Sequence, residues 1–134
     1  MGDGTLILFT LGEARFGVPM ASVREIVRAE AARAGAAAPV GSLGYLDVRG
    51  QSLPIVDPRP DLQLAADAPC ENVVVIDDER GPFGLLVEQV VGTARVDGLS
   101  DVGCAGRGIA GIGELADGLV VVLEPLELGL ALAA

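Results

Sequence analysis

Short apolar runs separated by turn-forming residues dominate this sequence. The run from Val73 to Ile76 is continuous and fully apolar, which is typical of a strand buried on both faces, and Thr5 to Leu11 has a similar character. Gly, Pro, Asn and Asp residues stand between the runs, where strands turn. The runs are not separated by helical crossovers, so a parallel sheet is not expected. The pattern predicts a mostly β chain, folded as antiparallel barrels or a sandwich.

Tight turns are predicted at two places. Asp117-Gly118 lies between two apolar runs and is the strongest hairpin signal, because this pair favours a two-residue turn of the primed type. A second turn is predicted at Gly50 and Gln51, since glycine tolerates a positive φ. The segments expected to form strands are 5–11, 15–18, 43–49, 52–57, 72–77, 83–91, 93–96, 109–116 and 119–123.

A short amphipathic helix is predicted from Pro19 to Arg28, after the first hairpin. Proline can open a helix, because its missing N–H would be unpaired there. Met20, Val23 and Val27 would then share one apolar face, and Glu25 would point outward. This face either packs against the core or contacts a partner, and both interpretations stay open.

The rest of the chain indicates one small domain with an aliphatic core. In the tail from Glu124 to Leu132, two leucines four residues apart predict a C-terminal helix. A length of 134 residues supports a single domain, residues 1–134. Hydrophobic residues make up 51% of the chain, which excludes disorder as its default state, whereas aromatic residues make up only 3%. The core must therefore consist mainly of Val, Leu, Ile and Ala.

The charge and the missing residue types exclude several function classes. A formal net charge of -10 repels phosphate backbones and anionic lipid heads, so nucleic acid and membrane surfaces are poor partners. The chain has no histidine, which removes the commonest general base and metal ligand. Cys70 and Cys104 are far apart and form no Cys-x-x-Cys motif, so we expect no metal, no cofactor and two buried thiols. Because the N-terminus resembles no signal peptide, we expect a cytoplasmic protein.

Three local motifs suggest chemistry that their context does not support. Gly106 to Gly111 matches G-x-G-x-x-G but leads into a predicted strand, so it is interpreted as a loop rather than a dinucleotide site. Gly41 to Gly44 resembles a nucleophile elbow, yet no triad can form without histidine. Asp57, Asp77 and Asp78 are interpreted as solvated turn carboxylates, with a carboxylate-based hydrolase as the distant alternative.

Arg49 is the candidate binding residue that the local sequence singles out. It ends an apolar strand beside a tight turn, where an arginine is either a surface charge or a planar donor for a defined partner. The local sequence favours neither interpretation.

Seven motifs follow one another along the chain, at 8–12 with 15–18, 23–26, 44–50, 53–57, 83–90, 109–113 and 121–126. In this order they resemble those of the CheW family, the adaptors that couple bacterial chemoreceptors to their histidine kinase. Two departures stand out: Glu88 replaces the usual aspartate, and Pro58 replaces the usual leucine. The segment 98–107 is also shorter than the corresponding family loop.

The resemblance implies two five-stranded SH3-like barrels around a shared aliphatic core. It implies a non-catalytic adaptor, in which one barrel contacts the regulatory domain of a CheA-type kinase. A hydrophobic groove near the lobe junction would take the helical tip of a chemoreceptor. The positions that match the family's partner contacts are Val23, Glu25, Gly44, Arg49 and Gly50.

The departures from the family pattern leave a second function open. With Pro58 and the shorter segment 98–107, the chain suits a specialised CheW-like paralogue that binds receptors without coupling the kinase.

Overall fold

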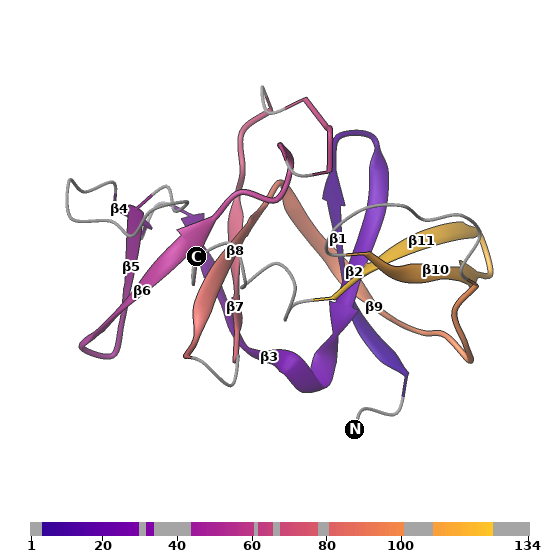
Figure 1. Ribbon diagram of the computed structural model, residues 1–134, viewed down its shortest axis with the longest axis horizontal. Helices are drawn as coiled ribbons and strands as arrows, with labels where there is room; N and C mark the ends of the chain where they lie inside the picture. Colours follow the sequence, from indigo (N-terminus) through magenta and orange to yellow (C-terminus); the bar gives the residue numbers. More distant parts are fainter. Residues whose placement is uncertain are drawn as a thin grey trace.

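The computed structural model describes residues 4–29, 32–33, 44–60, 62–65, 68–77, 81–100 and 109–124. Within these residues eleven strands form two sheets, which lie side by side in Figure 1. The terminal lobe has the strand order β10-β11-β2-β1-β9, and the central lobe has the order β3-β7-β8-β6-β5-β4. The strands are β1 (Thr5–Leu11), β2 (Ala14–Pro19), β3 (Val23–Arg28), β4 (Ala32–Arg33), β5 (Gly44–Val48), β6 (Gln51–Val56), β7 (Asn72–Ile76), β8 (Phe83–Val87), β9 (Gln89–Arg95), β10 (Ile109–Leu115) and β11 (Gly118–Leu123).

The mostly β prediction is confirmed, with two corrections to the strands. The terminal lobe has the expected five strands, but the two-residue β4 gives the central lobe a sixth. The strand predicted over 83–91 is interrupted at Glu88. There β8 of the central lobe ends and β9 of the terminal lobe begins, so the chain crosses between lobes at this residue.

The helix predicted from Pro19 to Arg28 is wrong. Pro19 ends β2, one turn of 3-10 helix forms at Met20–Ser22, and Val23–Arg28 forms β3, which pairs with β7. Burial alternates along β3 with the period of two of a strand, although the apolar residues Val23, Ile26 and Val27 have helical spacing. The β-branched Val23 and Val27 fit the half-buried face of this paired strand. The predicted C-terminal helix lies outside the described residues.

Both predicted hairpins form, each with its turn one residue earlier than expected. Val48 pairs with Gln51, which places the first turn at Arg49 and Gly50. Their φ angles of 50° and 83° are both positive, as a type I′ turn requires. The second turn likewise falls at 116–117, between Leu115 and its partner Gly118.

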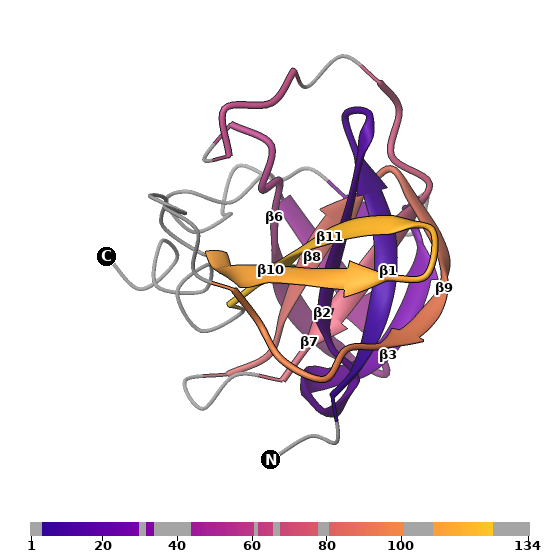
Figure 2. The ribbon, with the colours of Figure 1, turned by 90° about the vertical axis from the view of Figure 1, so that its right-hand side faces the viewer.

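The two lobes repeat one topology. The order β10-β11-β2-β1-β9 corresponds to β5-β6-β8-β7-β3, and each lobe contains one short parallel pairing, β11 with β2 and β6 with β8. These two parallel pairings are exceptions to the antiparallel arrangement that the sequence predicts. In Figure 2 the hairpin β10–β11 crosses β1 and β2 of the terminal lobe.

The repeat extends to the register of single residues. One residue in each outer strand has no opposite partner: Arg24 in β3 and Val91 in β9. The lobes therefore align with Val90 at the position of Val23 and Gly92 at the position of Glu25. The same alignment of the strand registers matches Phe83-Gly84 to Phe16-Gly17.

Among the described residues, three apolar clusters form the core, one in each lobe and one between them. The shared cluster takes residues from both sheets and includes all three phenylalanines of the sequence. The rings of Phe9 and Phe16 stack at 6.5 Å between their centroids. All other members are aliphatic, as the composition predicts. The shared cluster consists of Ile7, Phe9, Leu11, Phe16, Val18, Val56, Val74, Ile76, Phe83, Leu85, Val87 and Leu123.

Gly84 in β8 lies close to Val73 of the neighbouring strand β7, and replacing this glycine tests how tightly the two strands pack. A Cβ added at Gly84 would lie 2.6 Å from Cγ1 of the fully buried, stiff Val73. We predict that Gly84→Ala lowers the free energy of unfolding by about 1–3 kcal/mol through overpacking. Gly98→Ala is the control, since nothing lies within 4 Å of its added Cβ, and it should change stability by less than about 0.5 kcal/mol. If both variants change the free energy of unfolding equally in denaturant titration, the close packing of Gly84 against Val73 is contradicted.

Candidate partner-binding site

The inward face of β3 carries two of the predicted binding residues. Val23, Glu25 and Val27 are half-buried, whereas the residues between them are exposed. Val23 packs against the shared core and Val27 against the core of the central lobe. Glu25 was expected to point outward from a helix. It lies instead on the inward face of a strand, with its side chain 24% exposed.

Glu25 meets Arg49 across the central lobe. The Glu25 carboxylate oxygen Oε2 lies 3.7 Å from Nη1 of Arg49. This oxygen is shielded from solvent and accepts no hydrogen bond from the described residues. The Arg49 side chain is 81% exposed, because it extends from the turn between β5 and β6. The structure thus shows Arg49 as a solvated surface guanidinium held loosely by one carboxylate.

The five predicted binding residues do not all meet at one point. Glu25, Arg49 and Gly50 gather at the β5–β6 turn, and Val23 lies on the same face of β3 as Glu25. Gly44 pairs with Ile55 at the opposite end of the β5–β6 hairpin, roughly 16 Å along the strand from Arg49.

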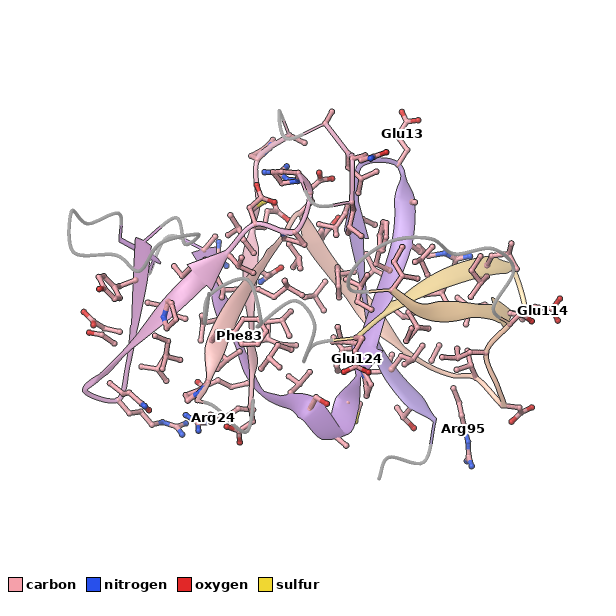
Figure 3. All side chains as sticks on the ribbon, viewed as in Figure 1. Glu13, Arg24, Phe83, Arg95, Glu114 and Glu124 are labelled. Carbon is pink, nitrogen blue, oxygen red and sulfur yellow. The ribbon has the colours of Figure 1, made fainter. Side chains whose placement is uncertain are left out.

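The terminal lobe lacks this ion pair. Its register places Gly92 and Ala116 where the central lobe has Glu25 and Arg49. A cleft of about 580 Å³ lies there between β9 and the β10–β11 hairpin. Arg15 bonds to Asp117 at 2.9 Å beside this cleft, and this hydrogen bond lowers the pKa of the Asp117 carboxyl. In Figure 3, Arg95 and Glu114 project outward from the same lobe.

Sequence reasoning missed a second, buried group of charges. Asp57, Arg59 and Glu88 form a buried ion network at the lobe junction, with side chains 10%, 6% and 11% exposed. Arg59 donates from Nε and Nη2 to the two Asp57 oxygens, each at 3.0 Å. Its Nη1 donates to Glu88 at 3.1 Å and to the carbonyl oxygen of Ala68 at 2.7 Å.

The network corrects the interpretation of Asp57 as a solvated turn carboxylate. Burying a carboxylate is costly unless it is paired, and here the Arg59 fork provides the pair. Asp77 is exposed as predicted and bonds to Arg24 at 2.9 Å, whereas Asp78 lies outside the described residues. The sequence offered one signal for Arg59, a basic residue that stands between two prolines, two positions after a strand-ending carboxylate.

The network also sets the protonation of its neighbours. The hydrogen bond to Asp57 raises the pKa of Arg59 above its ordinary value, so this guanidinium stays charged. Cys70 is half-buried rather than fully buried, and Cys104 lies outside the described residues. Desolvation raises the pKa of the Cys70 thiol, and the positive charge of Arg59 opposes this shift.

Comparison with known proteins identifies the family. The sequence model of the CheW-like domain matches residues 5–129. The chain belongs to the CheW-like domain family. A probable chemotaxis protein CheW of Rhizobium etli is 37% identical over 91 residues, which cover 66% of this chain and 59% of that protein. The chemotaxis protein CheW of Treponema pallidum is 28% identical over 116 residues, covering 81% of this chain and 66% of that protein.

The chain spans less than two thirds of the length of either of these CheW relatives. The fold of this CheW-like domain also matches that of a solved structure. The crystal structure of the scaffolding protein TtCheW from Thermoanaerobacter tengcongensis superposes with a TM-score of 0.82 at 16% identity. The match covers 93% of this chain and 86% of that one.

The described parts of the chain show two further features relevant to function. They contain no group of three or more Cys, Asp or Glu residues placed to hold a metal ion. Among the same residues, no helix has the length and apolarity needed to cross a membrane.

Replacing Arg59 tests the buried ion network. We predict that Arg59→Met lowers the free energy of unfolding by about 3–5 kcal/mol, because it leaves two carboxylates buried without their cation. Arg24→Met is the matched control, since it breaks an exposed ion pair of similar length and should cost no more than about 1 kcal/mol. If both variants lose a similar free energy of unfolding in denaturant titration, the network contributes no more to stability than an exposed ion pair.

The reactivity of Cys70 tests its environment. In a Cys104→Ser background, the rate of Cys70 alkylation follows the fraction of thiolate. Since burial raises the folded-state pKa, the rise in rate with pH should occur at higher pH in the folded protein than in denaturant. The unfolded thiol loses its proton at lower pH than the folded thiol. The free energy of unfolding should therefore fall as the pH rises from the ordinary thiol pKa toward the raised one. If the alkylation rates of the folded and the denatured protein rise over the same pH range, the raised pKa of Cys70 is contradicted.

Proposed function

We propose that this protein is a cytoplasmic, non-catalytic adaptor that couples chemoreceptors, the methyl-accepting chemotaxis proteins, to a CheA-type histidine kinase. The observation that carries the proposal is the family match over residues 5–129, nearly the whole chain. Two relatives are named as chemotaxis CheW proteins, and the structural neighbour is described as a scaffolding protein. The partners are the cytoplasmic tip of a receptor and the regulatory domain of the kinase.

We propose further that Arg49, Gly50 and Glu25 form the centre of one partner surface. An exposed guanidinium at a tight turn presents planar donors without deforming the sheet. The loose contact with Glu25, at 3.7 Å, orients Arg49 while leaving most of its donors accessible to a partner. Val23 borders this surface on β3, whereas Gly44 lies at the far end of β5 and would contact only a partner that extends along the hairpin.

The described residues favour one of the two alternative functions over the other. A paralogue that binds receptors without coupling the kinase is favoured by Pro58, which is buried directly before Arg59. A hydrolase with paired carboxylates finds less support. Asp57 is bonded to Arg59 and Asp77 to Arg24, so each carboxylate is held by an arginine.

Separate binding measurements with a receptor tip fragment and the kinase regulatory domain test the proposed function. We predict that Arg49→Ala weakens binding to at least one of them by about 2 kcal/mol or more, as for a binding hot spot. Its effect on stability should stay within about 0.5 kcal/mol, because the side chain is mostly solvated. Glu25→Lys should weaken the same interaction, with a salt-dependent association rate.

The control is Arg95→Ala, which removes an equal charge from the exposed outer strand of the terminal lobe. It should leave both affinities unchanged. A large loss of thermal stability in Arg49→Ala, with unchanged affinity per folded molecule, would make Arg49 a structural residue. Binding of the receptor fragment alone by the wild-type protein would favour the paralogue without kinase coupling. Binding of neither partner would contradict the adaptor function.

A further inference from the structure

The two lobes meet mainly through apolar side chains. The shared core combines aliphatic residues and phenylalanines from both sheets, and Phe83 of β8 lies between the lobes in Figure 3. Apolar burial is non-directional, since it depends on the area removed from water rather than on bond geometry. Such a core holds the lobes together but discriminates weakly between closely related orientations.

Two of the directional contacts across the junction are made by Glu88, and a third joins the backbone N–H of Val90 in β9 to Oδ1 of Asn72 in β7, at 3.2 Å. The backbone N–H of Glu88 donates to the carbonyl oxygen of Thr10 in β1, at 3.2 Å. Its carboxylate oxygen Oε2 accepts the backbone N–H of Gly12 at 3.0 Å and Nη1 of Arg59 at 3.1 Å. Arg59 in turn is held by the fork to Asp57, at the end of β6 in the central lobe. A continuous chain of bonds thus runs from β6 to the β1–β2 turn.

We propose that Arg59 is a positioning residue that sets the orientation of the terminal lobe relative to the central lobe. Its planar fork accepts only a narrow range of geometries, so it fixes Glu88 relative to Asp57. Glu88 then fixes the β1–β2 turn through Gly12. The residue acts through the carboxylate of Glu88 and does not itself contact the terminal lobe in the bonds described.

The energetics of buried ions separate this role from simple stabilisation. Replacing a whole buried ion network by neutral side chains of similar volume is often neutral or stabilising, because the desolvation cost disappears as well. If the network positions the lobes, its complete replacement should leave the protein folded. The terminal lobe should then no longer have one defined orientation relative to the central lobe. The terminal lobe should then move as a unit.

The test compares distances between and within the lobes. Spin labels are placed at two exposed positions in different lobes, Gln51 and Leu119, in a Cys70→Ser, Cys104→Ser background. A second pair, Thr93 and Leu119, reports distances within the terminal lobe. Label–label distances are measured by pulsed electron paramagnetic resonance, with circular dichroism and denaturant titration to establish folding.

The decisive variant combines Asp57→Asn, Arg59→Met and Glu88→Met. The asparagine preserves an acceptor for the backbone N–H of Arg59, which bonds to Asp57 in the native chain. We expect a folded protein in which the distance distribution between lobes shifts or broadens and the distribution within the lobe does not. The control, Arg24→Met with Asp77→Asn, removes an exposed ion pair and should leave both distributions unchanged.

Two results would overturn the proposal. An unchanged distribution between lobes in the folded triple variant would show that the apolar core alone sets the orientation. Equal broadening within and between lobes would show a general loss of packing instead. If the triple variant does not fold, Arg59→Lys decides, because it keeps the charge and loses the planar fork. The proposal then requires Arg59→Lys to broaden the distribution between lobes selectively, and an unchanged distribution rejects it.

Discussion

The apolar core shared by the two lobes is the constraint on which the rest of the structure depends. A small sheet of short strands cannot bury both of its faces alone, so each lobe packs one face against the other lobe. Phe9, Phe16 and Phe83 supply the largest side chains of this core. With so few aromatic residues in the chain, placing all three phenylalanines at the junction concentrates apolar area where the lobes must be held together.

Because the two lobes repeat one topology, a residue pair present in only one lobe is not required by the fold. The strand orders, the parallel pairings and the interruptions in the outer strands correspond. Glu25 and Arg49 nevertheless have only Gly92 and Ala116 as counterparts. The fold therefore does not require an ion pair at this position. That absence of structural need is what makes the exposed Arg49 a candidate for binding rather than for stability.

The two charged groups of the central lobe illustrate opposite physical regimes. Arg49 is mostly solvated, so its contact with Glu25 contributes little to folding and leaves the guanidinium accessible. Arg59 is buried between two carboxylates, where removing one partner is costly and geometry is narrowly defined. One arginine thus suits recognition of a partner, and the other suits positioning within the molecule.

The sequence by itself determined most of the strands and the two hairpins, because apolar runs and turn residues are local properties. The order of its motifs indicated the family. The sequence did not decide between helix and strand over 19–28, where Val23 and Val27, four residues apart, share a face in either element and only pairing with β7 selects the strand. Nor did it show that Glu25 meets Arg49, or that Arg59 is buried. Those outcomes depend on how distant strands close around a core, and ion pairing follows spatial neighbours rather than neighbours along the chain.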